Sequence, residues 1–327
     1  MGKKDIVTKE YISNNSIFAD ICNFYLFNGE NVIVPGELVE RDATELSVVF
    51  SEEQVLPVQK LRDVLKKTVV KSTGAVIYMI IGVENQSEIN YAMCIKNMIY
   101  DALNYAGQVQ EIAAGHRAKR DLKTAEFLSG FAKTDMLIPV VTITVYWKSG
   151  AWDGPRTLHE MLNVSDADIL KYVQDYRLNL IVPDEIDDFS KFSTELRKIM
   201  KFISCTEDAD KMTEFYEIYH KDGLISQKGA ILLNECFGAE IEISEEEGEK
   251  VDMCKGMVGF GLKKKEEGIA QGIAQGIAQG LHEGTLQILI DLVTEGELSI
   301  EKAAGKAQMS VEAFQTLLTT NCTSGIN

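Results

Sequence analysis

The alternation of apolar and polar residues in the first third of the chain predicts a β-hairpin. Residues 61–70 (LRDVLKKTVV) and 75–84 (AVIYMIIGVE) are rich in β-branched and other apolar side chains, which favour strands. Between them, Lys71-Ser72-Thr73-Gly74 has the composition of a tight turn. We therefore expect two antiparallel strands that are joined directly.

Helical periodicity is found on both sides of this hairpin. Residues 14–28 repeat apolar side chains at three- and four-residue spacing, and Asn28-Gly29 tolerates the left-handed conformation that ends a helix. Residues 89–112 have the same periodicity and predict a long amphipathic helix.

Two further strands complete the predicted core. Residues 138–147 (IPVVTITVYW) are typical of a buried strand, and residues 45–50 favour a short one. The resulting order is helix, strand, strand, strand, long helix, strand. This order predicts an α/β fold, an α+β mixed sheet flanked by helices.

The second half of the chain is predicted to be mainly helical over 156–245, with one more strand at 178–183. The charged stretch 245–250 then suggests a domain boundary. We expect three regions: 1–250 with helical elaboration from about 156, a repeat region over 251–284, and a short helical hairpin over 285–327.

The repeat region carries Gly-Ile-Ala-Gln three times in tandem over 268–279. Each glycine costs about 1 kcal/mol relative to alanine inside a helix, so such a helix needs a partner at close approach. A self-association helix and a partly helical linker both remain open. In the tail, Ser299 and Ser310 are N-cap candidates for two short helices. Residues 310–320 contain no Lys or Arg, which favours a packing or dimerisation hairpin over a DNA reader.

Composition indicates a soluble, cytoplasmic protein. Of the 327 residues, 45% are hydrophobic and 25% charged, and no apolar run of about 18 residues predicts a membrane span. The N-terminus lacks the apolar segment of a secretory signal. The six cysteines are scattered without a CxxC pair, which favours reduced thiols over a zinc site.

The net charge of −17 argues against DNA binding by the molecule as a whole, but the charge is unevenly distributed. Residues 1–150 hold 16 basic and 18 acidic side chains, whereas residues 151–327 hold 17 and 32. The half that contains the hairpin is therefore close to neutral. At the hairpin, net charge is therefore only a weak argument against nucleic-acid binding.

The hairpin also carries the candidate chemistry. Glu84 and Gln86 point to the same face of a strand, and the hairpin can bring Asp63 beside them. Two carboxylates and an amide at adjoining strand ends suit a hard divalent cation and a water molecule. Taken singly, each of these residues is explained as well by a solvated strand end.

Several blocks of the sequence resemble the Rpn-type recombination-promoting nucleases, also described as putative transposases, of the PD-(D/E)XK nuclease superfamily. The most specific blocks are RDVLKK followed by IGVENQ, YAMCIKNMIYDALNYAGQV, and IPVVTITVYWKSGAWDGPRTLHEML. FADICNFYLFNGENVI and the glycine-rich tail are similar as well, so the resemblance covers roughly residues 10–320. It implies a restriction-endonuclease-like core and DNA cleavage that depends on Mg²⁺ (or Mn²⁺).

The resemblance also implies roles for individual residues. Asp63 and Glu84 match the two motif acids, expected to hold the metal, and Asp20 matches an additional supporting acid. Gln86 stands where the family usually has lysine, and a primary amide cannot act as a general base near neutrality. Lys96 stands where close relatives have arginine, and Cys94 where they have proline. The following residues are expected to contact DNA phosphates: Lys66, Lys67, Lys96, Arg117 and Arg120.

Three interpretations follow. The first is a metal-dependent DNA endonuclease linked to recombination or a mobile element. The second is a catalytically degenerate nuclease fold that binds nucleic acid without cutting it, which Gln86 and the acidic surface favour. The third is an interaction protein that forms homo-oligomers through the C-terminal repeat helix.

Overall fold

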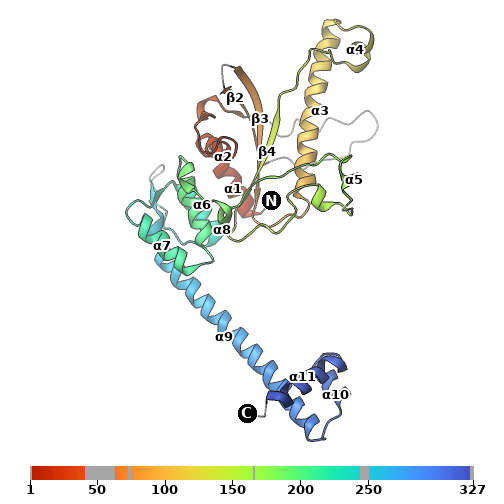
Figure 1. Cartoon of the computed structure of the whole chain (residues 1–327). Helices are drawn as coiled ribbons and strands as arrows, with labels where there is room; N and C mark the ends of the chain where they lie inside the picture. The colour runs from red at the N-terminus through yellow and green to blue at the C-terminus, as the bar shows by residue number, and fades with distance from the viewer. Residues whose placement is uncertain (1, 41–62, 73–74, 165, 244–249, 325–327) are drawn as a thin grey trace. The chain divides into compact units, whose positions relative to one another are not determined.

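The computed structural model describes residues 2–40, 63–72, 75–164, 166–243 and 250–324 (Figure 1). The predicted strand at 45–50 and part of the predicted turn at 71–74 lie outside these residues. The chain divides into two compact units, residues 1–261 and 262–327. The division falls inside one helix, α9 (Met253–Thr294).

A five-stranded mixed sheet lies at the centre of the first unit, in the strand order β1-β2-β3-β4-β5. Its strands are β1 (Val39–Glu40), β2 (Val64–Ser72), β3 (Ala75–Gln86), β4 (Val140–Tyr146) and β5 (Asn179–Ile181). The first three strands pair antiparallel, whereas β3–β4 and β4–β5 pair parallel. The predicted hairpin and the mixed sheet are confirmed.

One face of the sheet carries the main hydrophobic core. Alternate strand residues such as Ile81, Val83 and Ile143 are completely buried there. They belong to one core with apolar side chains from helices that include α1 (Lys3–Ser13), α2 (Asn15–Phe27), α6 (Leu196–Cys205) and α8 (Gln227–Phe237). The predicted end of α2 is confirmed, because Asn28 is its left-handed C-cap with φ of 53°.

The opposite face of the sheet is covered by α3 (Met93–Lys119), which connects β3 to the parallel strand β4. Figure 1 shows α1 and α2 on one side of the strands and α3 on the other. This helix is longer than the predicted 89–112 and ends at Arg120, whose φ is 54°. A short helix, α4 (Thr124–Ser129), follows at its far end.

The prediction of helices over 156–178 is wrong for most of that stretch. It contains a 3-10 turn (His159–Met161) and the four-residue α5 (Ala167–Leu170). The reason is long-range pairing, because Leu158 N donates to Tyr176 O and Leu178 N donates to Arg156 O. These bonds hold the chain extended at both ends of the segment. The strand expected at 178–183 is confirmed as β5.

The described part of the first unit also contains smaller elements. They are α7 (Ala209–Tyr219) and a two-stranded sheet of β6 (Leu224–Ile225) and β7 (Val251–Asp252). Further 3-10 turns among these residues lie at Pro35–Glu37, Pro183–Glu185 and Phe189–Lys191.

The second unit contains α9 from Leu262 onward, with α10 (Ile300–Lys306) and α11 (Val311–Ser324). The repeat over 268–279 lies within α9 and is helical, which both a self-association helix and a partly helical linker allow. A small core holds these helices together: Leu289, Ile290, Ala303, Ala304 and Phe314. Ser310 Oγ accepts a hydrogen bond from Ala313 N, as expected of an N-cap. Among the helices described in either unit, none has the length and apolarity to cross a bilayer.

Candidate functional site

The hairpin brings the two predicted acids, Asp63 and Glu84, together. Val64 pairs with Val83, so Asp63 lies beside Glu84 at the end of the strand pair. The backbone N–H of Asp63 donates to Glu84 Oε1 at 3.3 Å, and the N–H of Asn85 donates to Asp63 Oδ2 at 2.9 Å. Each carboxylate is thus oriented by a backbone group of the opposite strand.

A third charged group comes from α3. Lys96 Nζ lies 2.8 Å from Glu84 Oε2, and the two side chains are 27% and 1% exposed. A carboxylate removed from water needs such a partner. Lys96 was predicted to contact a DNA phosphate, and in the structure its ammonium contacts an acid of the site. The sequence contains one indication of this pairing: no other Lys or Arg occurs over 72–116.

The charges around Asp63 have opposing effects on its pKa. Burial raises the pKa of this carboxyl group above its usual value. The hydrogen bond from Asn85 and the nearby ammonium groups of Lys96 and Lys9 act in the lowering direction, while Asp5 adds to the increase. The carboxylate therefore lies in a partly dehydrated position where a cation is favoured.

The donor set at these strand ends fits a hard divalent cation. Across the described part of the chain, no group of three or more His, Cys, Asp or Glu side chains is arranged to hold a metal. Mg²⁺ requires less, because it is commonly bound through one or two carboxylates and keeps several waters. Asp63 and Glu84 supply those two carboxylates, so the residues present are compatible with this ion.

Gln86 lies two residues beyond Glu84 on the same strand, and side chains at this spacing share a face. The carbonyl of Gln86 accepts a hydrogen bond from Trp147 N at 2.8 Å. Asn85, between them, faces the opposite side, where its Oδ1 accepts from Trp147 Nε1 at 2.6 Å. Both bonds attach this end of β3 to Trp147, the residue that follows β4.

Asp20 has a different set of partners. Its carboxylate is buried and accepts hydrogen bonds from Ser193 N (2.8 Å) and Thr194 N (2.9 Å) and from both hydroxyl groups. These contacts tie α2 to the segment that leads into α6. They account for the buried charge without a metal ion.

The predicted phosphate contacts separate into three environments. Lys66 is 2% exposed, and its Nζ donates to Ser13 O and Asn15 Oδ1 at 2.6 and 2.5 Å. These bonds place the Lys66 ammonium at the α1–α2 junction, away from the surface where a phosphate would bind. Lys67 is half-buried on β2. Arg117 and Arg120 are exposed at the far end of α3.

A layer of buried polar side chains between α3 and β4 was not predicted. Asn97 Nδ2 donates to Thr144 Oγ1 at 2.9 Å, and Thr142 Oγ1 donates to Asp101 Oδ1 at 2.6 Å. Further along the helix, Gln108 bonds to both backbone groups of Ile138. The helix that covers the candidate site is therefore attached by hydrogen bonds as well as by apolar contacts.

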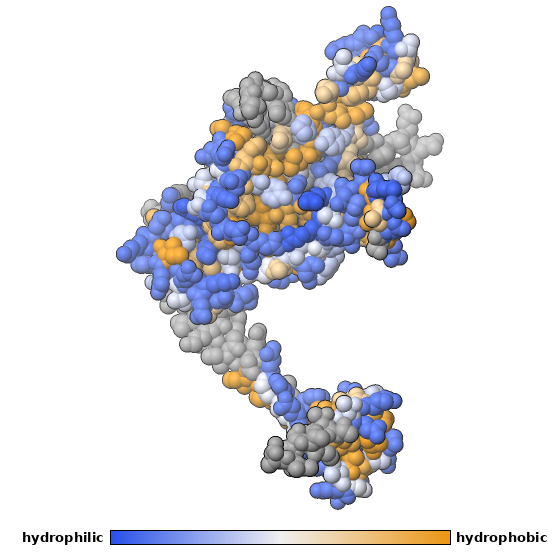
Figure 2. Space-filling view, in the orientation of Figure 1, coloured by the Kyte–Doolittle hydropathy of each residue, from blue (hydrophilic) through white to orange (hydrophobic). Residues whose placement is uncertain are grey.

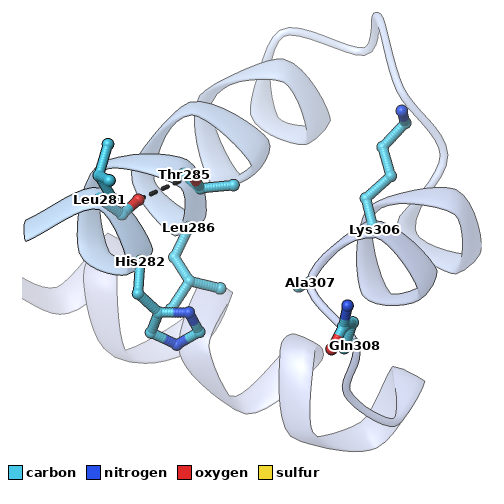
Figure 3. Close-up of a pocket in the computed structure, with 7 residues that line it drawn as sticks. All are labelled: Leu281, His282, Thr285, Leu286, Lys306, Ala307 and Gln308. Carbon is cyan, nitrogen blue, oxygen red and sulfur yellow. Dashed lines mark hydrogen bonds between the residues drawn. The ribbon is translucent and has the colours of Figure 1, made fainter. Parts of the chain in front are cut away.

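The second unit contains a hollow of about 280 Å³ between the end of α9 and α10 (Figure 3). The residues that line it include His282 and Lys306. No carboxylate is among the residues that line it, so it does not resemble a site for a hard cation. None of the sequence-predicted site residues lies there.

Comparison with known proteins adds no relative: no family model, curated protein or solved structure matches this chain.

Proposed function

We propose that the chain hydrolyses phosphodiester bonds in DNA with a divalent metal ion held by Asp63 and Glu84. The observation that carries this proposal is the hydrogen bond from the backbone N–H of Asp63 to Glu84 Oε1 at the ends of β2 and β3, with Lys96 Nζ 2.8 Å from Glu84 Oε2. Adjacent carboxylates with a nearby ammonium group match the needs of phosphoryl chemistry, in which negative charge develops on oxygen.

The residues have separate roles in this proposal. Asp63 and Glu84 would hold Mg²⁺ or Mn²⁺, which when bound supplies charge stabilisation and a more acidic water. Lys96 neutralises Glu84 in the metal-free protein. Once the cation takes over this role, the ammonium is free to contact a phosphate oxygen. Gln86 orients a water molecule by hydrogen bonding and does not remove its proton.

The fold supports the more specific proposal of a restriction-endonuclease-like core. N-terminal helices, an antiparallel hairpin, a long crossover helix and a parallel strand follow one another and form a mixed sheet with flanking helices, the kind of core that the resemblance implies. The candidate acids lie on the hairpin of this arrangement, as expected. The proposal of a nuclease related to the Rpn type rests on this order together with the sequence blocks.

The decisive experiment is cleavage of supercoiled plasmid with Mg²⁺ or Mn²⁺ by the full-length protein. Glu84→Gln keeps the size of the side chain and removes its charge, so we expect at least a hundredfold loss of nicking. Glu88→Gln is the matched control, because Glu88 is exposed and pairs with Lys148 on the surface. Equal nicking by both variants would contradict the proposal.

A catalytically inactive fold that binds nucleic acid is the alternative that Gln86 favours. The same plasmid assay separates the two, provided that DNA binding is measured in parallel by fluorescence anisotropy. Binding without cleavage under either metal, with the circular dichroism spectrum of a folded protein, would establish the alternative.

Self-association through α9 is a second proposed property. Ile273, Ile277 and Leu281 lie four residues apart and are exposed, and a Cβ added at Gly276 or Gly280 would meet open space. A second copy of the helix is a suitable partner for such an exposed stripe. Replacing Gly276 and Gly280 by leucine should lower the oligomer mass in analytical ultracentrifugation; an unchanged mass would rule out this contact.

A further inference from the structure

The far end of α3 projects beyond the ends of the strands and carries α4 (Figure 1). We call residues 116–137 the α3 tip. It contains five basic side chains in a protein whose net charge is −17. The basic residues of the tip are Arg117, Lys119, Arg120, Lys123 and Lys133, and all of them are exposed.

The acids of the same tip are engaged inside it. His116 Nδ1 lies 2.8 Å from Asp121, and its Nε2 lies 2.9 Å from Asp135. Asp135 also accepts a hydrogen bond from Ala132 N, and Glu126 accepts one from Lys133 N. The three carboxylates therefore hold the tip together, with the imidazole bridging two of them.

The basic side chains are not used in this way. Within the described part of the chain, none of the five forms an ion pair. The internal acids are thus satisfied locally, and the outward charge of the tip is positive. Such a surface is complementary to a polyanion.

Large apolar side chains are exposed among these cations. Phe127, Leu128 and Met136 are 69%, 86% and 84% exposed. Figure 2 shows hydrophobic and hydrophilic surface side by side on the tip. Proteins that bind and deform duplex DNA commonly combine cations with apolar side chains that contact sugars and bases in the groove.

The length of α3 relates the tip to the candidate site. Lys96, at Glu84, and Arg117, at the tip, are on one continuous helix. At 1.5 Å per residue their separation along the axis is roughly 32 Å. This length corresponds to about ten base pairs, or one turn of duplex DNA. One duplex can therefore reach both places.

We propose that the α3 tip is a second contact for double-stranded DNA, about one helical turn from the candidate site. Arg117 and Arg120 contact the phosphates, and the side chains of α4 lie against the groove. This inference rests on the proposed function for the identity of the polyanion. An anionic membrane surface offers similar charge, but the spacing to a site for phosphodiester chemistry favours the duplex.

The test measures binding and cleavage separately with the full chain. Binding of a 24-base-pair duplex is measured by fluorescence anisotropy for the protein and for Arg117→Gln/Arg120→Gln. We expect about tenfold weaker binding, and a slope of log affinity against log salt that is shallower by about two, because two phosphate contacts are lost. Lys221→Gln/Lys302→Gln removes two other exposed lysines and should leave both values unchanged.

Apolar substitutions provide a second measurement. Phe127→Ala should weaken duplex binding about threefold without changing the salt slope, since no ionic contact is lost. The matched control is Tyr172→Ala, in the turn that follows α5, where the side chain is 81% exposed and distant in sequence from the tip. Circular dichroism checks that each variant is folded.

The outcomes distinguish the two proposals. Duplex affinity and salt slope that are unchanged in Arg117→Gln/Arg120→Gln would overturn the role of the tip, even if plasmid cleavage is observed. Tip-dependent duplex binding without cleavage would support the tip and contradict the nuclease. Binding to vesicles of 30% phosphatidylserine that is lost in the tip variant, with duplex binding unaffected, would identify a membrane contact and overturn the inference.

Discussion

The two faces of the five-stranded sheet differ in the side chains they present to the helices that cover them. Toward α1, α2 and α6 the strands present buried aliphatic residues, among them Ile81, Val83 and Ile143. Toward α3 the same strands present Glu84, Thr142 and Thr144, which are buried as well. Because side chains alternate along a strand, neighbouring residues serve the two faces in turn.

The two faces therefore have different roles: one stabilises the fold, and the other carries the candidate chemistry. Burial of apolar surface is the main favourable contribution to folding, whereas buried polar groups are close to neutral when paired and costly when not. We infer that the aliphatic face supplies most of the stability. The polar face can then hold two carboxylates at a small net cost, provided that every partner stays in place.

The largest expected effect is on the aliphatic face. Ile143→Ala removes three carbon atoms from a fully buried position and should lower the free energy of unfolding by about 2–5 kcal/mol. Urea denaturation measures this value. If Thr142→Ala on the polar face proved equally destabilising, the proposed division between the faces would be lost.

The next effect concerns the ion pair. Lys96→Gln leaves Glu84 buried without its cation, and because Lys96 is partly exposed we expect a loss of about 2 kcal/mol. Mg²⁺ should restore more stability to this variant than to the unmodified protein, since the ion no longer competes with the ammonium. Thermal unfolding with and without Mg²⁺ measures both effects.

The control for this prediction is Lys148→Gln. It breaks the exposed pair with Glu88 and should change stability by less than about 1 kcal/mol. An equal response of both variants to Mg²⁺ would show that the ion does not act at Glu84.

A smaller effect is expected in the polar layer. Thr144→Val removes the acceptor for Asn97 Nδ2 and should cost about 1–2 kcal/mol. Asn97→Leu combined with Thr144→Val removes both partners and should cost less than Thr144→Val alone. A double-mutant cycle by urea denaturation measures the coupling, and additive costs would contradict it.

The smallest expected effect is a pH dependence of local stability at the far end of α3. The hydrogen bonds to Asp121 and Asp135 raise the pKa of His116. The stabilisation that the protonated imidazole gives to the folded tip is therefore full below about pH 6.5 and is lost as pH rises through the raised pKa. The pKa of Asp121 is lowered by the same hydrogen bond, so its contribution is lost only in strong acid.

Hydrogen exchange of the amides in 121–135 measures this dependence. Exchange, corrected for its intrinsic pH dependence, should show stronger protection at pH 5.5 than at pH 8.5. His116→Gln should remove most of the difference. The same pH dependence in that variant would show that a group other than His116 causes the pH dependence of exchange in the tip.

Local sequence pattern predicted the parts of the fold that depend on neighbours in the chain. The hairpin, the ends of α2 and the contact between Asp63 and Glu84 all follow from side-chain period and turn composition. The conformation of residues 156–178 did not follow, because hydrogen bonds between the two ends of this stretch hold those ends extended. A helical pattern of apolar residues does not reveal such a pairing.

The partners of the buried charges did not follow from the local pattern either, and the absence of another Lys or Arg over 72–116 was the one indication of Lys96. Asp20 accepts from Ser193 and Thr194, which lie more than 170 residues away. Lys96 reaches Glu84 because α3 crosses the sheet between two parallel strands. Which of many cations and hydroxyl groups meets a given acid depends on tertiary packing, and periodicity carries no information about it.

The connection between β3 and β4 has a consequence for the order of folding. The hairpin that joins Asp63 to Glu84 closes a short loop, whereas the parallel pairing of Ile80 with Val140 must wait for the whole of α3. Short loops close at lower entropic cost, so we expect the two acids to meet before Lys96 arrives. A cation that binds them at this stage would accelerate folding as well as slow unfolding. Stopped-flow refolding at increasing Mg²⁺ concentration measures this, and a refolding rate independent of Mg²⁺ would place the pairing of the acids after the transition state.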